Sequence, residues 1–241
     1  MTLSVTAIPL FKDNYAWLLR DSATGATAVV DPADAAPVEA AILAAGGRLD
    51  LILLTHHHAD HVAGTDEIRA RFGCPVVGAA ADAHRLPKLD RAVREGDTVA
   101  IGAAVGQVID TPGHTVGHIA FYYPDGRALL CGDTLFSLGC GRLLEGNAAD
   151  MFASLRKFAA LPADTQVYCG HEYTESNARF AITVEPDNAA LKQRVAEIQA
   201  LRAAGKSTVP STLGEELAAN PFLRAPDAAA LGKIRAAKDS F

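Results

Sequence analysis

One short segment limits what this chain can fold into more than any other. The apolar run Leu51–Leu54 is rich in branched residues, which predicts a buried strand. After Thr55, six residues hold four potential metal ligands: His56, His58, Asp60 and His61. Histidines two apart in an extended loop point the same way, and imidazole and carboxylate groups suit zinc, iron or manganese. The segment therefore predicts a metal site where a strand ends.

Composition excludes several classes of protein. The 241 residues, 49% hydrophobic and 21% charged, are typical of a globular chain with a sizeable core. A formal net charge of −6 leaves no basic surplus to neutralise phosphates, so nucleic-acid binding is not expected. No apolar stretch reaches the roughly 18 residues that cross a membrane. The first residues lack the features of a secretory signal. Four scattered cysteines without a CxxC pair favour reduced thiols and a cytoplasmic location.

Strands and helices alternate over the first 170 residues. Hairpins near the start predict antiparallel pairing, and the strand–helix–strand unit around the histidine segment predicts a parallel pair. We expect strands at 3–10, 15–19, 28–30, 51–54 and 76–77, more within 97–109 and 119–130, and a last one at 167–169. Helices are expected at 35–45 and 148–161, then by periodicity over 172–204, 213–218 and 227–238. These patterns predict a domain of residues 1–170 and a helical domain of residues 171–241.

Other candidate ligands lie where later strands give way to loops. His114, in a tight turn, and Asp133 and His171, after strands, could join the histidine segment if strand ends gather at one sheet edge. Together they complete two neighbouring metal sites. Asp31 either caps the following helix or hydrogen-bonds near the metals. His118 either packs in the core or supports the site in the same way.

The histidine segment has the pattern HxHxDH, and in this the chain resembles the metallo-β-lactamase superfamily. The resemblance implies an αββα sandwich with two divalent metal ions, zinc first, with iron and manganese as alternatives. One ion would be held by His56, His58 and His114, the other by Asp60, His61 and His171, with Asp133 bridging them. Two such ions lower the pKa of a shared water from about 15.7 toward 7. A metal-bridging hydroxide would then be the nucleophile, with Asp60 and Asp133 as the catalytic residues that hold it.

Other segments resemble the hydroxyacylglutathione hydrolase (glyoxalase II) family over essentially the whole chain. They are 13–15, 132–136, 139–142, 170–173, 220–224 and 233–239. The resemblance implies hydrolysis of the thioester S-D-lactoylglutathione to glutathione and D-lactate, a step of methylglyoxal detoxification. Residues 171–241 would form the glutathione-binding domain, and the substrate would be bound by Arg142, Tyr173, Arg235 and Lys238. Position alone would make Arg235 and Lys238 the solvated basic end of a helix. Leu144 departs from family members that carry a tyrosine there.

Two other interpretations stay open. The first is another enzyme of the superfamily: a lactonase, a β-lactamase, or a persulfide dioxygenase, which uses one iron with fewer ligands. The second is a metal-dependent binding module without catalysis. For the favoured interpretation, the partner is a small glutathione thioester, and nothing in the sequence requires more than a monomer.

Overall fold

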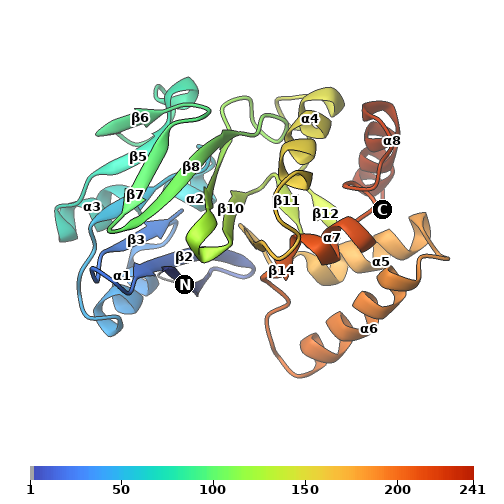
Figure 1. Cartoon of the computed structure of the whole chain (residues 1–241), viewed down its shortest axis with the longest axis horizontal. Coiled ribbons are helices and arrows are strands. Elements are labelled where there is room, and N and C mark those ends of the chain that lie inside the picture. Colours follow the sequence, from blue (N-terminus) through green and yellow to red (C-terminus); the bar gives the residue numbers. More distant parts are fainter. Residues whose placement is uncertain (1–2) are drawn as a thin grey trace. The chain divides into compact units, whose positions relative to one another are not determined.

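The computed structural model describes residues 3–241, which form two compact units (Figure 1). The first unit contains the described residues up to Asp110 together with Gly117–Gly132. The second contains Thr111–Val116 and Asp133–Phe241. These units are divided differently from the predicted domains 1–170 and 171–241, and that boundary stays a prediction.

The first unit is built on a mixed six-stranded sheet. Its strands lie in the order β1 (Leu3–Leu10), β2 (Asn14–Asp21), β3 (Thr27–Val30), β4 (Leu51–Leu53), β5 (Val76–Ala79) and β6 (Arg91–Val93). Strands β1, β2 and β3 pair antiparallel, and β3 to β6 pair parallel. The predicted hairpins and the parallel pairing of β4 with β5 are therefore confirmed.

Four antiparallel strands complete this unit. They lie in the order β10 (Ala128–Gly132), β9 (Ile119–Tyr123), β8 (Ala104–Asp110) and β7 (Thr98–Ile101). The helical segments are α1 (Ala35–Ala44), α2 (Ala59–Val62), α3 (Thr65–Phe72), η1 (Ala80–Asp82) and η2 (Pro124–Gly126). Helix α1 packs against β1, β2 and α3.

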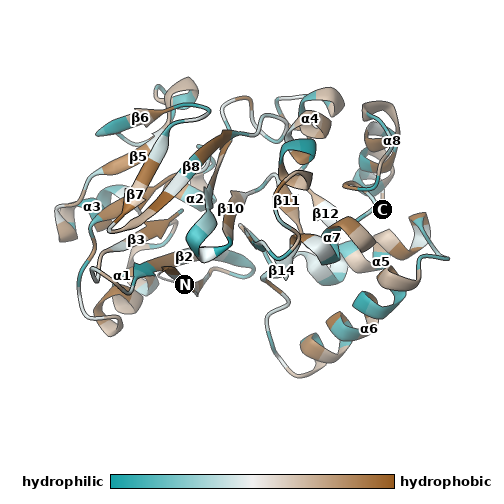
Figure 2. Cartoon of the chain, viewed as in Figure 1, coloured by the Kyte–Doolittle hydropathy of each residue, from teal (hydrophilic) through white to brown (hydrophobic). Residues whose placement is uncertain are grey.

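Burial explains why the central strands are continuous apolar runs. Every residue of β3, β4 and β5 is buried. A strand covered on both faces has no solvent side to alternate with, so it carries branched apolar residues throughout. Figure 2 shows these hydrophobic residues along the strands of the first unit. The ends of such strands are fixed positions from which loops can present polar side chains.

The second unit is mainly helical. Its helices are α4 (Ala148–Ala159), α5 (Thr174–Val184), α6 (Ala189–Ala203), α7 (Leu213–Ala219) and α8 (Ala228–Asp239). Its strands are β11 (Leu135–Phe136), β12 (Gly139–Cys140), β13 (Gln166–Cys169) and β14 (Ser211–Thr212). Strands β11 and β12 form a hairpin, and β13 pairs antiparallel with β14. Helix α5 packs on α6, and α4 packs on α8.

Two details of the predicted helical region are wrong. The helix expected over 172–204 is interrupted at Glu185, because the next residue, Pro186, has no N–H to donate and disfavours helical backbone before it. Asn188 then starts α6 by accepting a hydrogen bond from the Leu191 N–H at 3.1 Å. The strand at 167–169 is not the last, because β14 follows it in the chain. Over the described residues, no helix combines the length and apolar character needed to cross a membrane.

Candidate active site

The histidine segment connects β4 to α2 in the first unit, and its imidazoles lie close together. His56 and His61 are buried, and His58 is half-buried. His56 Nε2 lies 3.1 Å from His58 Nδ1. Two nitrogens bound tetrahedrally to one zinc ion at about 2.0–2.1 Å lie about 3.3 Å apart. The spacing of this pair therefore suits two ligands of a single ion.

Asp31, at the end of β3, orients His61. Its buried carboxylate accepts hydrogen bonds from the Thr55 N–H at 2.9 Å, the Thr55 hydroxyl at 2.7 Å and His61 Nδ1 at 3.0 Å. Because a carboxylate only accepts, His61 carries its proton on Nδ1 and leaves Nε2 available to a metal. Asp34, not Asp31, caps helix α1. Of the two roles expected for Asp31, the contacts support hydrogen bonding to a candidate metal ligand.

His118 supports His56 by stacking. The two rings lie 4.8 Å apart between centroids with an interplanar angle of 24°. Gly132, at the end of β10, passes beside them with φ +46. A Cβ there would lie 2.5 Å from Thr55 Oγ1 and 2.8 Å from His118 Nε2, so the close approach requires glycine.

Two residues of this unit were missed by the sequence analysis. Asn14 donates from Nδ2 to Asp60 Oδ2 at 3.1 Å and to the Asp60 carbonyl oxygen at 3.0 Å, which holds the loop and its carboxylate together. Asp82, in η1, lies 3.1 Å from His57 Nδ1, so His57 is held by a carboxylate of its own. In the sequence, Asn14 belongs to the segment 13–15 that resembles the family, but no fixed spacing links Asn14 to Asp60 or His57 to Asp82.

In the second unit, two imidazoles flank one carboxylate oxygen. Asp133 Oδ2 lies 3.5 Å from His114 Nε2 and 3.4 Å from His171 Nε2, and all three residues are buried. Asp133 directly follows β10, and His171 lies two residues after the end of β13, as the sequence predicted for ligands near strand ends. The His171 ring stacks on Tyr173 at 4.5 Å. An oxygen placed between two imidazole nitrogens is arranged as a shared ligand would be.

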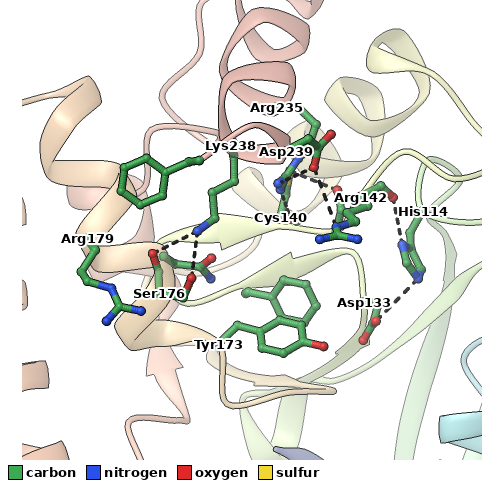
Figure 3. Close-up of a pocket in the computed structure, with 14 residues that line it drawn as sticks. His114, Asp133, Cys140, Arg142, Tyr173, Ser176, Arg179, Arg235, Lys238 and Asp239 are labelled. Atoms are coloured by element: carbon green, nitrogen blue, oxygen red, sulfur yellow. Dashed lines mark hydrogen bonds and ion pairs between the residues drawn. The ribbon is translucent and has the colours of Figure 1, made fainter.

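A cavity of about 750 Å³ opens beside His114 and Asp133 and lies within the second unit (Figure 3). Aromatic side chains of Phe136 and Tyr173 line its wall. Its cationic side chains are Arg142, Arg179, Arg235 and Lys238, accompanied by the carboxylate of Asp239. All four predicted substrate-binding residues thus line one cavity. Leu144 is 59% exposed and is not part of its lining.

The cations of α8 are held in place by neighbouring groups. Arg235 is buried and donates from Nη1 to the Cys140 carbonyl oxygen at 2.8 Å and from Nη2 to Asp239 at 2.9 Å. Lys238 donates from Nζ to the carbonyl oxygen and the hydroxyl of Ser176, at 3.0 and 3.1 Å. Burial, together with the positive charges of the cavity's three arginines, lowers the pKa of Lys238 to about 8.

Ser176 and Arg179, both on α5, are lining residues that the sequence analysis missed. They follow Tyr173 at intervals of three residues, and Tyr173 directly precedes α5. Residues three apart on a helix share a face, so this spacing was the available signal once Tyr173 had been singled out.

The donor groups of both units suit divalent metal ions. The candidates are imidazoles and carboxylates, mostly buried, and no thiolate is among them, which matches a hydrolytic metal site better than a structural zinc site. The cationic cavity suits an anionic ligand, because arginine and lysine form charge-assisted hydrogen bonds to carboxylates. The arrangement can therefore bind a negatively charged molecule beside candidate metal ligands.

Comparison with protein families agrees with this chemistry. Residues 11–171 match the model described as the Metallo-beta-lactamase superfamily. The crystal structure of ETHE1 from Myxococcus xanthus is 26% identical, with a TM-score of 0.71, over 97% of this chain and 90% of that one. TTHA1623, crystallised in a di-iron-bound form, is 29% identical with a TM-score of 0.59 over 70% of this chain and 91% of that one. The chain is a member of the metallo-β-lactamase superfamily, and the predicted fold class is confirmed.

Comparison with relatives identifies one family within this superfamily. Residues 172–241 match the model described as Hydroxyacylglutathione hydrolase C-terminus. The hydroxyacylglutathione hydrolase of Methylococcus capsulatus is 51% identical, over 99% of both chains. That of Rhodospirillum rubrum is 57% identical over 94% of this chain and 89% of its own. Within the superfamily, the chain belongs to the hydroxyacylglutathione hydrolase family, a family whose fold implies divalent metal ions.

Proposed function

We propose that this chain is a hydroxyacylglutathione hydrolase that converts S-D-lactoylglutathione to glutathione and D-lactate. The observation that carries the proposal is the cavity of the second unit, which joins His114 and Asp133 to a group of four cations. Glutathione has two carboxylates that such cations can bind. A thioester releases a thiolate, which is a good leaving group, so no general acid is needed for it.

We further propose that the candidate ligands of both units hold two divalent ions, zinc first, with iron or manganese as alternatives. One ion is assigned to His56, His58 and His114, and the other to Asp60, His61 and His171, with Asp133 shared between them. Ions held in this way lower the pKa of water and stabilise negative charge on a carbonyl oxygen. The chain's own part is to orient the imidazoles: Asp31 fixes the proton of His61 on Nδ1, which leaves the other nitrogen free to ligate.

The setting of the enzyme is proposed to be the cytoplasm. All four cysteines are free and buried, as suits a compartment in which thiols stay reduced. We propose that a monomer suffices, because nothing in the sequence requires a second copy of the chain. The mass of the purified protein in solution tests the second statement.

The test of the function is thioester hydrolysis measured together with metal content. We expect the protein to carry bound zinc, iron or manganese, and to hydrolyse S-D-lactoylglutathione in preference to a β-lactam, a homoserine lactone or oxidation of glutathione persulfide. Preference for any of those three would contradict the proposal. Binding of glutathione conjugates without release of thiol would indicate a non-catalytic module instead.

Asp133→Ala tests the assignment of the shared ligand. We expect it to lose most of the bound metal and most of the activity, because one carboxylate serves both ions. Asp125→Ala is the matched control, since Asp125 is an exposed acid of η2 away from the candidate ligands. An Asp133→Ala protein with full metal content and near-normal turnover would overturn the assignment.

A further inference from the structure

The structure contains an unassigned cation at the far end of the cavity. Arg179 lies on α5 and lines the same cavity as Lys238. Figure 3 shows it at the end opposite to His114 and Asp133, with Tyr173 between them. A ligand that reacts beside His114 and Asp133 must therefore extend along the cavity to reach Arg179.

Arg179 differs from the other cations in its partners. Arg142 and Arg235 face Asp239 at 3.8 and 2.9 Å, and Lys238 donates to Ser176. Across residues 3–241, by contrast, the side chain of Arg179 forms no hydrogen bond or ion pair, so all donors of its guanidinium are available. Its positive charge is also one of the causes that lower the pKa of Lys238. An anionic group at this end would relieve that repulsion.

The chemistry of the proposed substrate supplies such a group. Glutathione ends in two carboxylates, and that of the γ-glutamyl residue lies more covalent bonds from the sulfur than that of the glycyl residue. With the thioester beside His114 and Asp133, the γ-glutamyl carboxylate has the longer reach. Arg235 and Lys238, on α8, are closer to the middle of the cavity (Figure 3), where the shorter arm would lie.

We propose that Arg179 is a specificity-determining residue that binds the γ-glutamyl carboxylate of the glutathione thioester. This inference rests on the proposed function and deepens it, because it assigns one of the two carboxylates to a particular side chain. It makes the enzyme selective for thioesters whose thiol part is long enough to place a carboxylate at the far end of the cavity.

The test combines a charge deletion with a substrate in which one carboxylate is masked. For S-D-lactoylglutathione, we expect Arg179→Ala to raise KM roughly 3- to 10-fold with kcat unchanged, the size of an exposed ion pair with hydrogen bonds. With the γ-glutamyl carboxylate converted to an amide, Arg179→Ala should have no further effect. With the glycyl carboxylate esterified, the effect of Arg179→Ala should persist.

Arg156→Ala is the matched control. It removes the same charge from an exposed position on α4 that does not line this cavity. An effect of Arg179→Ala no larger than that of Arg156→Ala would overturn the proposal. An equal effect of Arg179→Ala on S-D-lactoylglutathione and on both masked substrates would also overturn the proposal. That result would indicate a general electrostatic effect of the positive charge and not a contact with one carboxylate.

An error in the proposed function can be distinguished from an error in the role of Arg179. If the wild-type protein does not hydrolyse S-D-lactoylglutathione, the function is wrong, whatever Arg179 does. The dissociation constants of S-methylglutathione and its two masked forms then still test the contact, because binding is measured without turnover. Wild type and Arg179→Ala should differ for S-methylglutathione and its glycyl ester, but not for the γ-glutamyl amide. Any other pattern overturns the assignment.

Discussion

His114 donates from Nδ1 to the backbone carbonyl oxygen of Arg142 over 2.9 Å. A carbonyl oxygen can only accept, so His114 carries its proton on Nδ1 and turns Nε2 toward Asp133. The orientation of this candidate ligand therefore depends on the path of the backbone at Arg142. The guanidinium of the same residue lines the cavity and faces Asp239. Backbone and side chain of one residue thus have separate roles.

Removing only the side chain should affect binding and spare the metal site. We expect Arg142→Ala to retain its metal and its kcat, because the carbonyl that His114 needs is still present. KM should rise by about 2- to 5-fold, a modest effect because the side chain is 72% exposed. Steady-state kinetics with elemental analysis check this. A large loss of metal would show that the side chain, and not the backbone, orients His114.

A change that moves the backbone next to Arg142 should instead disturb the metal site. A Cβ at Gly141 would lie 2.0 Å from the carbonyl oxygen of Asp133, so the chain must shift in Gly141→Ala. Overpacking of this kind costs about 1–3 kcal/mol. Because the shift displaces the carbonyl that orients His114, we expect lower metal content and a loss of kcat/KM of roughly 10- to 100-fold. Gly205→Ala, at a position where a Cβ has no close neighbour but φ is +67, controls for glycine replacement as such. Unchanged kinetics in Gly141→Ala would contradict the argument.

Asp31 offers a test of ligand orientation without disturbing the backbone. Its φ of +53 lies in the left-handed region, which asparagine also tolerates. In Asp31→Asn the amide nitrogen cannot accept, so Thr55 and His61 lose one acceptor between them. We expect affinity for metal to fall about 10- to 100-fold with little change in the far-ultraviolet circular dichroism spectrum. Metal affinity equal to that of wild type would mean that Asp31 serves only the fold.

The pKa of Lys238 predicts how substrate binding changes with pH. Burial is the largest cause of its lowering to about 8, followed by the charges of Arg235, Arg179 and Arg142, while Asp239 opposes them. As pH rises through 8, the ammonium loses its proton and the cavity loses positive charge. We expect S-methylglutathione to bind more weakly at pH 9 than at pH 7. Lys238→Arg keeps its charge and should flatten this dependence. A wild-type affinity that is constant over this range would count against the role of Lys238.

The parts of the fold that follow local pattern could be predicted from sequence. Strands β1 to β5 and helix α4 have clear periodicity or apolar runs, and the ligands at strand ends follow from them. Strand β14 has only two residues, Ser211 and Thr212, too few to show any alternation. It forms because β13 lies beside it, which is a long-range contact.

The contacts that support the candidate site could not be predicted either, because they too join residues far apart in the sequence. Asn14 reaches Asp60 across 46 positions of sequence, and His57 meets Asp82 across 25. Such pairs have no fixed spacing, so a single sequence does not reveal them. Arg179 has a helical spacing from Tyr173, but the predicted helix over 172–204 carries several other charged side chains, and spacing alone does not tell which of them faces the cavity.

Two buried residues, Glu216 of α7 and Asn220 directly after that helix, should hold the hairpin that lines the cavity. Glu216 is fully buried and accepts hydrogen bonds from the Leu138 N–H at 2.8 Å and from Asn220 Nδ2 at 3.0 Å. Asn220 also donates to the carbonyl oxygens of Phe136 and Gly139, in β11 and β12. Removing the carboxyl group leaves buried donors without an acceptor. We therefore expect Glu216→Ala to lower the free energy of unfolding by about 1–3 kcal/mol.

Glu216→Gln separates the contacts from the charge. The amide oxygen can accept the same hydrogen bonds, so this variant should unfold near the wild-type denaturant concentration at low pH. Burial raises the pKa of Glu216 in the folded protein, so its stabilising contribution is complete at low pH and is lost as pH rises through that pKa. Glutamine has no proton to lose. We therefore expect the stability of Glu216→Gln relative to wild type to increase between pH 5.5 and pH 8.5. Urea unfolding at both pH values measures it, and a constant difference would show that Glu216 is ionised in the folded protein at both pH values, as it is in the unfolded chain.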